Sequence, residues 1–384
     1  MNFTQYGDYF YLYILFLGLI PVMIMGLFKK KTKYYGLILS IVMTYLIMGK
    51  GIGLILFISF LVGETFVIYT YLYIRKKSNN KYIYFLFLFF SMLPVIITKL
   101  AGLTRYASTI GFIGLSYLNF RAIQMVIEIY DGQIKNVNLF TYLYFIMFFP
   151  TLSSGPIDRW KRFEDDLNKK LEKNEYLSQY LIPGFKKIIV AVLYKFVIAY
   201  LIDTYWMGVI PAEKTIFNIM NYMYAYTMYL FFDFAGYSLF AIGTGYILGI
   251  KVPENFNKPF LSKDMKEFWT RWHISLSRWF GDYIFSRFVL NSMRKKRFKS
   301  RFTASHVAQI LTMFIMGLWH GLTPYYILYG LYQGIALVLT DIYQRKSKFY
   351  KKHKKDKVFN CIQVVVTFHI VSFGMLLFSG YLFK

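Results

Sequence analysis

The sequence predicts an all-α protein that crosses a membrane many times. Of its 384 residues, 57% are hydrophobic and only 17% are charged, and the mean hydropathy is +0.42. Apolar runs longer than the ~18 residues that can cross a bilayer recur along the chain. Because a segment in lipid must satisfy its backbone polar groups internally, we expect these runs to be helices.

About ten to twelve spans are expected, with a few re-entrant or surface helices among them. No repeat or long linker divides the chain, so we predict a single integral-membrane domain over 1–384. Lys195 interrupts one of the apolar segments. The candidate segments are 9–28, 34–49, 51–74, 82–98, 106–120, 139–156, 188–202, 215–232, 234–250, 280–290, 307–340 and 358–383.

The net charge of +26 gathers in short loops between these segments, at 29–33, 75–81, 294–301 and 345–357. This distribution is the positive-inside pattern and argues against a nucleic-acid partner. It places the four loops in the cytoplasm, so the N-terminus is expected outside a cell membrane. The last span then leaves the C-terminus outside as well, although one miscounted helix would reverse that side.

The N-terminal segment lacks the features of a cleavable signal peptide, since Asp8 stands where a positive region would be expected. The chain has one cysteine, Cys361, in the last apolar segment. A single cysteine excludes an intrachain disulfide and a multi-cysteine metal site. We expect Cys361 to be a small core residue, with a thiol nucleophile as the less favoured alternative, and we expect no bound metal.

Two polar stretches interrupt the apolar pattern. Residues 157–187 alternate charged and apolar side chains at helical spacing, which favours an amphipathic helix on the cytoplasmic surface, or else a solvated connector. Residues 251–283 are too polar to span lipid yet hold three of the six tryptophans.

A helix over 264–283 would place Phe268, Trp272 and Trp279 on one face. Trp269, His273, Leu276, Ser277 and Phe280 would form a second face. Such a helix lies at the membrane interface or lines a polar cavity, with His273 between Trp269 and Ser277. The alternative is an interfacial aromatic helix with an incidental histidine.

His320 is the single side chain of the run 307–340 that ionises near neutral pH. It lies thirteen residues beyond Val307, which is ~20 Å of helix and past the middle of a ~30 Å hydrocarbon core. Gly321 and Pro324 predict that the helix ends there, at a site facing protein or a water-filled cavity. An ionisable group at this depth indicates function, unless it is a buried histidine bonded to a neighbouring carbonyl.

The remaining histidines, 306, 353 and 369, have weaker sequence contexts, and no metalloprotease, phosphate-loop or serine-hydrolase motif is present. His320 with a distant partner, of which His273 is the first candidate, is therefore the best chemical candidate.

Four segments resemble the signatures of the membrane-bound O-acyltransferase family, in order. They are "FPTLSSGPIDRWKRF" (149–163), "FFDFAGYSLFAIG" (231–243), "PENFNKPFLSKDMKEFWTRWHISLSRWFGDYIF" (253–285) and "MGLWHGLTPYYILYGLYQG" (316–334). "IGFIGLSYLNFRAIQMVIEIYDG" (110–132) is similar to an earlier family segment, so the likeness covers 110–334. It is greatest to the branch that D-alanylates teichoic acids. The alginate O-acetylases usually carry a glycine-rich loop where this chain has "IFSRFVLNSMRKKRF".

The resemblance implies a ring of helices around a funnel, with His320 catalytic and His273 a second important position. As general base on an acceptor hydroxyl, His320 would need donors for a tetrahedral oxyanion. The candidates are the indole N–H groups of Trp319 or Trp272, the hydroxyl of Ser277 and the tunnel wall at Trp269. It implies a D-alanine donor held as a phosphopantetheine thioester on a small acidic carrier protein in the cytoplasm, and no bound cofactor. The acceptor hydroxyl lies outside, on (lipo)teichoic acid, on a lipid intermediate or on a membrane partner with an extracellular side. The branch also implies a bacterial cell membrane.

The run "RKKRFKSR" (294–301) holds six positive charges in eight residues. Lys295, Lys296, Arg297 and Phe298 are therefore candidates for docking the acidic carrier, and anionic membrane lipids are the alternative partner. Three other functions stay open: an O-acetyltransferase of an exported polysaccharide, a transporter and a non-catalytic scaffold. Transporters often have a pair of broken helices at corresponding positions of their two halves. The sequence shows no such pair, which argues against the transporter.

Overall fold

The computed structural model describes residues 3–103 and 111–383, which are helical apart from turns and loops and contain no β-strand. The all-α polytopic class is confirmed. The start of the predicted segment 106–120 and of the family-like segment 110–132 lies outside the described residues. The contacts group the chain into two compact units, Met1–Val192 with Gly236–Pro253 and Leu193–Ala235 with Glu254–Lys384. The single domain over 1–384 stays a prediction.

Six helices are long and apolar enough to cross a membrane, by length and composition, within the described residues. They are α1 (Tyr9–Leu27), α3 (Ile52–Lys77), α4 (Lys81–Ala101), α10 (Ile216–Ile247), α14 (Arg301–His320) and α17 (Lys357–Ser379). The sequence predicted ten to twelve spans. The difference arises because several apolar segments form helices that are short, interrupted or more polar than these six.

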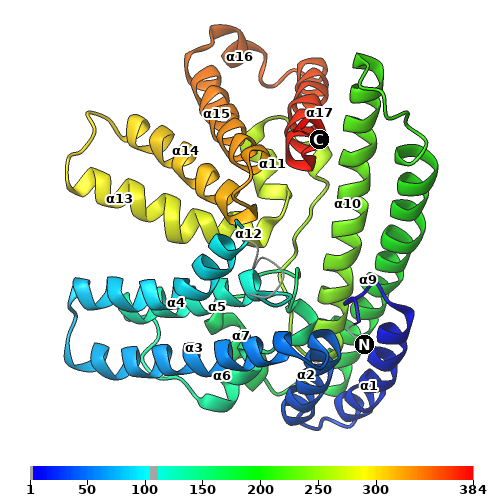
Figure 1. The fold of residues 1–384 in the computed structure, drawn as a ribbon, viewed down its shortest axis with the longest axis vertical. Coiled ribbons are helices and arrows are strands. Elements are labelled where there is room, and N and C mark those ends of the chain that lie inside the picture. Colours follow the sequence, from blue (N-terminus) through cyan, green and yellow to red (C-terminus); the bar gives the residue numbers. More distant parts are fainter. Residues whose placement is uncertain (1–2, 104–110, 384) are drawn as a thin grey trace. The chain divides into compact units, whose positions relative to one another are not determined.

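The first unit also contains α2 (Lys33–Met48), α5 (Leu115–Tyr130), α6 (Leu139–Ile146), α7 (Trp160–Asn168), α8 (Lys173–Tyr176) and α9 (Ile182–Val192). In Figure 1, α3 and α4 run side by side, and α5 packs against both. The predicted amphipathic helix over 157–187 is divided: α7 ends at Asn168, and α8 begins at Lys173 and continues through a π-helical turn, Leu177–Leu181, into α9.

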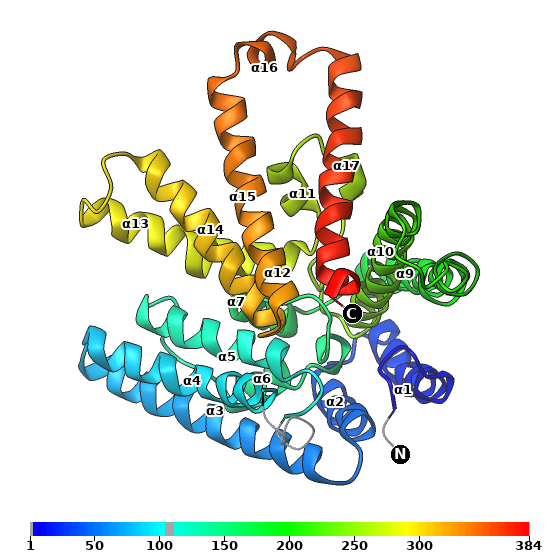
Figure 2. The same ribbon diagram turned by 45° about the horizontal axis from the view of Figure 1, so that its top comes forward.

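The second unit contains α11 (Met265–Arg271), α12 (Ile274–Phe280), α13 (Ser286–Arg294), α15 (Pro324–Lys346) and α16 (Lys348–His353), besides α14 and α17. Figure 2 shows α16 joining the ends of α15 and α17, which pack together. Ser300 caps α14 by accepting a hydrogen bond from the Thr303 backbone at 3.1 Å. The residues of α10 as far as Ala235 belong to this unit and the rest to the first.

Lys195 lies in a π-helical segment, Leu193–Ala199, that continues α9 and precedes another, Ile202–Met207. Its ammonium group forms an ion pair with Asp233 of α10, within the second unit. Pairing with an opposite charge is how an apolar segment accommodates a lysine.

Short 3₁₀ turns occur at Phe149–Thr151, Pro259–Leu261 and Tyr381–Phe383, and a further π-helical turn, Gly281–Phe285, joins α12 to α13. Cys361 is exposed on α17, so the prediction that it is a core residue is wrong. In a protein whose surroundings are lipid, an exposed apolar side chain on a spanning helix needs no burial.

Candidate active site

His273 lies at a break between two helices, and the predicted continuous helix over 264–283 is wrong. α11 ends at Arg271, α12 begins at Ile274, and His273 between them has φ +44° and ψ +51°. This is the left-handed region, which costs a residue other than glycine roughly 1–2 kcal/mol. The predicted faces are therefore rearranged: Phe268 and Trp272 stack, whereas Trp279 contacts Phe280 and Tyr283.

The loop before α11 holds the break in place. Asn255 is fully buried; its carbonyl accepts a hydrogen bond from the Ile274 backbone at 3.0 Å, and its side-chain oxygen accepts one from the Ser275 hydroxyl at 2.6 Å. On the other side of the break, the Asn257 backbone donates to the carbonyl of Arg271 at 2.9 Å. These bonds replace those that the helix loses, so the strained conformation of His273 is fixed by its surroundings.

The His273 imidazole is buried, with 4% of its surface exposed. The centroids of the His273 and Phe234 rings lie 4.7 Å apart, and the two rings form a T-shaped pair. Burial, and secondarily the neighbouring His320, lower the pKa of His273 to about 3. The ring is therefore neutral at physiological pH, able to donate one hydrogen bond and accept another.

His320 is the last residue of α14, as its sequence context predicts. The chain then turns through extended Gly321, and Pro324 begins α15. The half-buried imidazole is surrounded by aromatic side chains. Its centroid distances are 4.6 Å to Trp319, 4.9 Å to Phe378, 5.8 Å to Tyr326 and 6.2 Å to Tyr329.

Two glycines set the approach of α14 to α15 below this imidazole. A Cβ on Gly317 would lie 2.5 Å from the carbonyl oxygen of Tyr326, and one on Gly330 would lie 2.5 Å from that of Met313. Because the nearest atoms belong to the backbone of the other helix, no flexible side chain could move aside to make room for a Cβ. The glycines thus allow the close packing that orients His320 against Tyr326 and Tyr329.

The structure brings together some of the predicted site residues. Trp319 contacts His320, and His320 acts electrostatically on His273. Trp272 instead lies in an aromatic cluster with Phe256 at 5.0 Å, and Trp269 donates its indole hydrogen to Gln333 at 3.3 Å. The Ser277 hydroxyl donates to the carbonyl of Trp272 at 3.2 Å.

The candidate docking residues Lys295, Lys296, Arg297 and Phe298 lie between α13 and α14. The three basic side chains are exposed. Phe298 is half-buried and its ring lies 6.3 Å from that of Phe288. Lys296 has φ +50°, so the loop turns sharply at the charged residues.

A polar cluster that no sequence motif indicates surrounds Asp341 of α15. Its carboxylate binds Lys266 of α11 at 2.7 Å, His306 of α14 at 2.9 Å and Arg345 at 2.6 Å. The cluster ties three helices together near the predicted cytoplasmic loops. Asp341 is the one acidic side chain closing the long apolar segment, which is the signal that could have revealed it. The other two histidines, His353 and His369, donate from Nδ1 to the carbonyls of Phe349 and Val365, four residues earlier.

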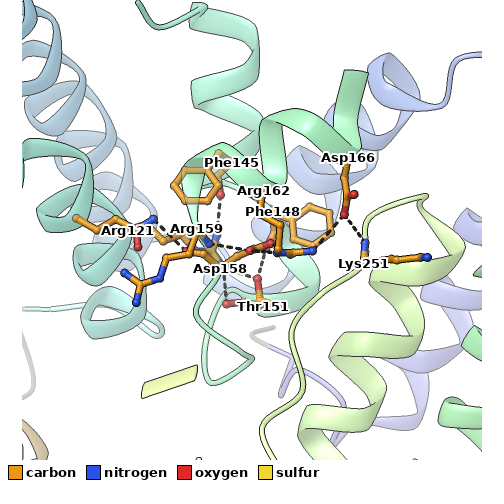
Figure 3. A network of polar contacts seen from close by, with 10 residues as sticks. Arg121, Phe145, Phe148, Thr151, Asp158, Arg159, Arg162, Asp166 and Lys251 are labelled. Carbon is orange, nitrogen blue, oxygen red and sulfur yellow. Dashed lines mark hydrogen bonds and ion pairs between the residues drawn. The ribbon is translucent and has the colours of Figure 1, made fainter. Parts of the chain in front are cut away.

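In the first unit, the family-like segment 149–163 is anchored by Arg121 of α5 (Figure 3). The buried guanidinium donates to the carbonyls of Phe145 and Thr151, each at 2.8 Å. Arg162 of α7 pairs with Asp158, and also with Asp166 at 3.1 Å. Burial raises the pKa of Asp158, although Arg162 and Arg121 favour its anionic form. These contacts hold the segment in place and therefore indicate a structural role for it.

Comparison with known proteins identifies one family and several relatives. The family model described as "MBOAT, membrane-bound O-acyltransferase family" matches residues 9–383. A teichoic acid D-alanyltransferase of Bacillus subtilis (strain 168) is 41% identical, with 98% of each chain covered. One of Lacticaseibacillus rhamnosus is 36% identical, with 100% of this chain and 99% of the relative covered. A probable alginate O-acetylase of Pseudomonas syringae pv. tomato is 32% identical over 70% of this chain and 49% of the relative.

Proposed function

Since this chain belongs to the membrane-bound O-acyltransferase family, we propose that it transfers D-alanine to a hydroxyl of (lipo)teichoic acid. The observation that carries this proposal is the full-length likeness to teichoic acid D-alanyltransferases, at 41% identity over 98% of both chains. The alginate O-acetylase likeness covers only 70% of the chain. The chain is thus an O-acyltransferase, and D-alanine is the acyl group that the relatives favour.

In this proposal the donor is a D-alanyl thioester on the phosphopantetheine arm of an acidic carrier protein in the cytoplasm. His320 is the general base. It takes the proton of the acceptor hydroxyl as that oxygen attacks the thioester carbonyl, and such assistance is worth ~10²–10⁴-fold. Collapse of the tetrahedral intermediate breaks the C–S bond, leaving an ester on the acceptor. The imidazolium returns the proton to the departing thiolate.

His273 then acts as a neutral partner near His320, orienting the donor or sharing the proton relay. Its low pKa suits a role that requires hydrogen bonding without a positive charge. Trp319, adjacent to His320, is the best placed of the candidate oxyanion donors. For Trp272, Trp269 and Ser277 the observed contacts favour wall-forming roles instead.

The basic loops at 29–33, 75–81, 294–301 and 345–357 are proposed to face the bacterial cytoplasm, where the carrier docks, with the N-terminus outside. Two helices separate each pair of loops, α2 with α3 and α14 with α15, as a common side requires. A membrane partner on the extracellular side would pass D-alanine to the polymer. Labelling of Lys50→Cys, but not Ser78→Cys, by an impermeant thiol reagent on intact cells checks this sidedness; the reverse pattern would refute it.

The direct test offers two donors to the same membranes. Vesicles containing the protein, teichoic acid and any partner would receive carrier protein loaded with labelled D-alanine or with labelled acetate. We expect D-alanine, and not acetate, to appear in the polymer, and His353→Ala to serve as an active control. Preferred transfer of acetate would favour the polysaccharide acetylase. Transfer of neither group, with carrier binding intact, would favour the transporter or scaffold.

A further inference from the structure

A lysine-rich pocket lies at one end of α1, within the first unit and away from the two histidines in sequence. It has a volume of about 290 Å³, close to the ~300 Å³ at which small-molecule sites begin. We call it the lysine pocket. Its charged lining consists of Lys29, Lys30, Lys31, Lys33, Lys169, Lys170, Asp166 and Glu172.

The acidic groups of the lysine pocket are already engaged. Glu172 pairs with Lys29. Asp166 accepts from Arg162 at 3.1 Å and from the Lys251 backbone at 2.8 Å. By contrast, Lys30, Lys31 and Lys170 are exposed and form no ion pair within 3–103 and 111–383. The pocket therefore presents unneutralised positive charge to whatever enters it.

The walls of the pocket are fixed by tight packing. Gly26, near the end of α1, meets the Tyr176 ring so closely that an added Cβ would lie 2.3 Å from it. The hydroxyl of Tyr176 donates to the carbonyl of Ile247 at 2.7 Å. Thr32, before α2, donates to the carbonyl of Leu248 at 3.3 Å. Segments distant in sequence thus hold the lysines around one hollow, unlike a row of lysines on a free loop.

The position of the pocket favours a lipid over a soluble anion. α1 is apolar enough to span the membrane, and it ends at Leu27, two residues before the first lysine of the pocket. The pocket therefore lies at the end of a spanning helix, the depth at which phospholipid headgroups are found. Basic pockets between spanning helices commonly bind acidic headgroups.

We propose that the lysine pocket binds the phosphate of an anionic phospholipid, such as phosphatidylglycerol, in the leaflet that the basic loops face. Lys30, Lys31 and Lys170 supply the charge. The bound lipid would brace the ends of α1 and α2 against α7 and α8.

The test compares two triple variants of the full-length protein in neutral detergent. One is Lys30→Gln/Lys31→Gln/Lys170→Gln. The matched control is Lys351→Gln/Lys352→Gln/Lys354→Gln, which removes the same charge around α16. Native mass spectrometry would count bound phosphatidylglycerol during titration, with phosphatidylcholine and inorganic phosphate as separate probes. We expect the pocket variant to bind phosphatidylglycerol about tenfold more weakly or worse, and the control to match the wild type.

Three results would overturn the proposal. Equal retention of phosphatidylglycerol by the pocket variant and the wild type would exclude the site. Equal binding of phosphatidylcholine would mean that the anionic headgroup is not recognised. Displacement of phosphatidylglycerol by inorganic phosphate at millimolar concentration, or by the acidic carrier protein, would assign the pocket to a soluble ligand. A thermal melt of each variant without added lipid verifies that both are folded.

Discussion

At the scale of single residues, the two histidines differ in how far the sequence reveals them. His320 stands out because it is alone in an apolar run and precedes Gly321 and Pro324; the structure places it at the end of α14, as expected. The sequence also singles out His273, but it does not predict the left-handed conformation of that residue. That conformation depends on Asn255, eighteen residues earlier in the chain, and no local pattern of helix propensity carries such a tertiary contact.

Replacing His273 by asparagine should separate its chemical role from its structural one. Asparagine tolerates the left-handed region, so His273→Asn is expected to fold, whereas β-branched His273→Val should be the less stable. We expect His273→Asn to lose most transfer activity while its Tm stays above that of His273→Val. Full activity of a folded His273→Asn protein would show that the imidazole is dispensable.

The pH dependence of stability gives a second readout on the same residue. The pKa of His273 is about 3 in the folded protein, against ~6.5 when unfolded. Between these values the unfolded chain binds the extra proton, so His273 makes the protein less stable as the pH falls from ~6.5 toward ~3. His273→Asn should therefore lose less Tm than the wild type between pH 7 and 4.5. An identical decrease in both would mean that the ring is not buried and neutral.

At the scale of helices, the sequence predicted elements better than their interruptions. The end of α14 and the restart at Pro324 follow from glycine and proline, whose effects are local. The break between α11 and α12, and the division of the 157–187 segment, depend on contacts from other segments, and π-helical turns have no simple sequence signal. The Asp341 cluster was missed for the same reason, since Lys266, His306 and Arg345 meet it only after folding.

The packing of α14 on α15 predicts a sharp difference between two glycine substitutions. Gly317→Ala would put a Cβ 2.5 Å from a carbonyl oxygen, whereas a Cβ on Gly63 of α3 would meet nothing within 4 Å. Overpacking of this kind typically costs ~1–3 kcal/mol. Gly317→Ala should lower the Tm in detergent and reduce transfer, because Tyr326 and His320 are displaced, while Gly63→Ala should leave both unchanged or slightly raise the Tm. Equal effects of the two substitutions would contradict the close packing of α14 and α15.

At the scale of the whole molecule, composition alone established the class. The apolar content and the clustered basic loops predicted a multi-pass membrane protein, and six suitable helices together with the family match over 9–383 agree. The ring of helices around a funnel and the docking of a carrier stay predictions, since they concern how the units and partners are arranged. Charge supports the second: the loop 294–301 is exposed and strongly basic.

Reversing the charges of Lys295, Lys296 and Arg297 to glutamate should weaken binding of the acidic carrier protein. Because the interaction is electrostatic, the difference from the wild type should be largest at low salt and shrink as ionic strength rises. Binding isotherms at two salt concentrations measure this, with Lys351, Lys352 and Lys354 reversed as the matched control. Wild-type affinity of the 295–297 variant at low salt would remove this loop from the docking surface.

The central claim is that His320 is the catalytic base, and one comparison tests it most directly. Single-turnover transfer from labelled D-alanyl carrier protein would be measured for the wild type, His320→Ala and His369→Ala, with carrier binding measured on the same preparations. His369 is the matched control, an imidazole on spanning helix α17 bonded to its own helix at Val365. We expect His320→Ala to bind the carrier normally but transfer ~10²–10⁴-fold more slowly, and His369→Ala to remain active. A His320→Ala protein with wild-type transfer would contradict the claim.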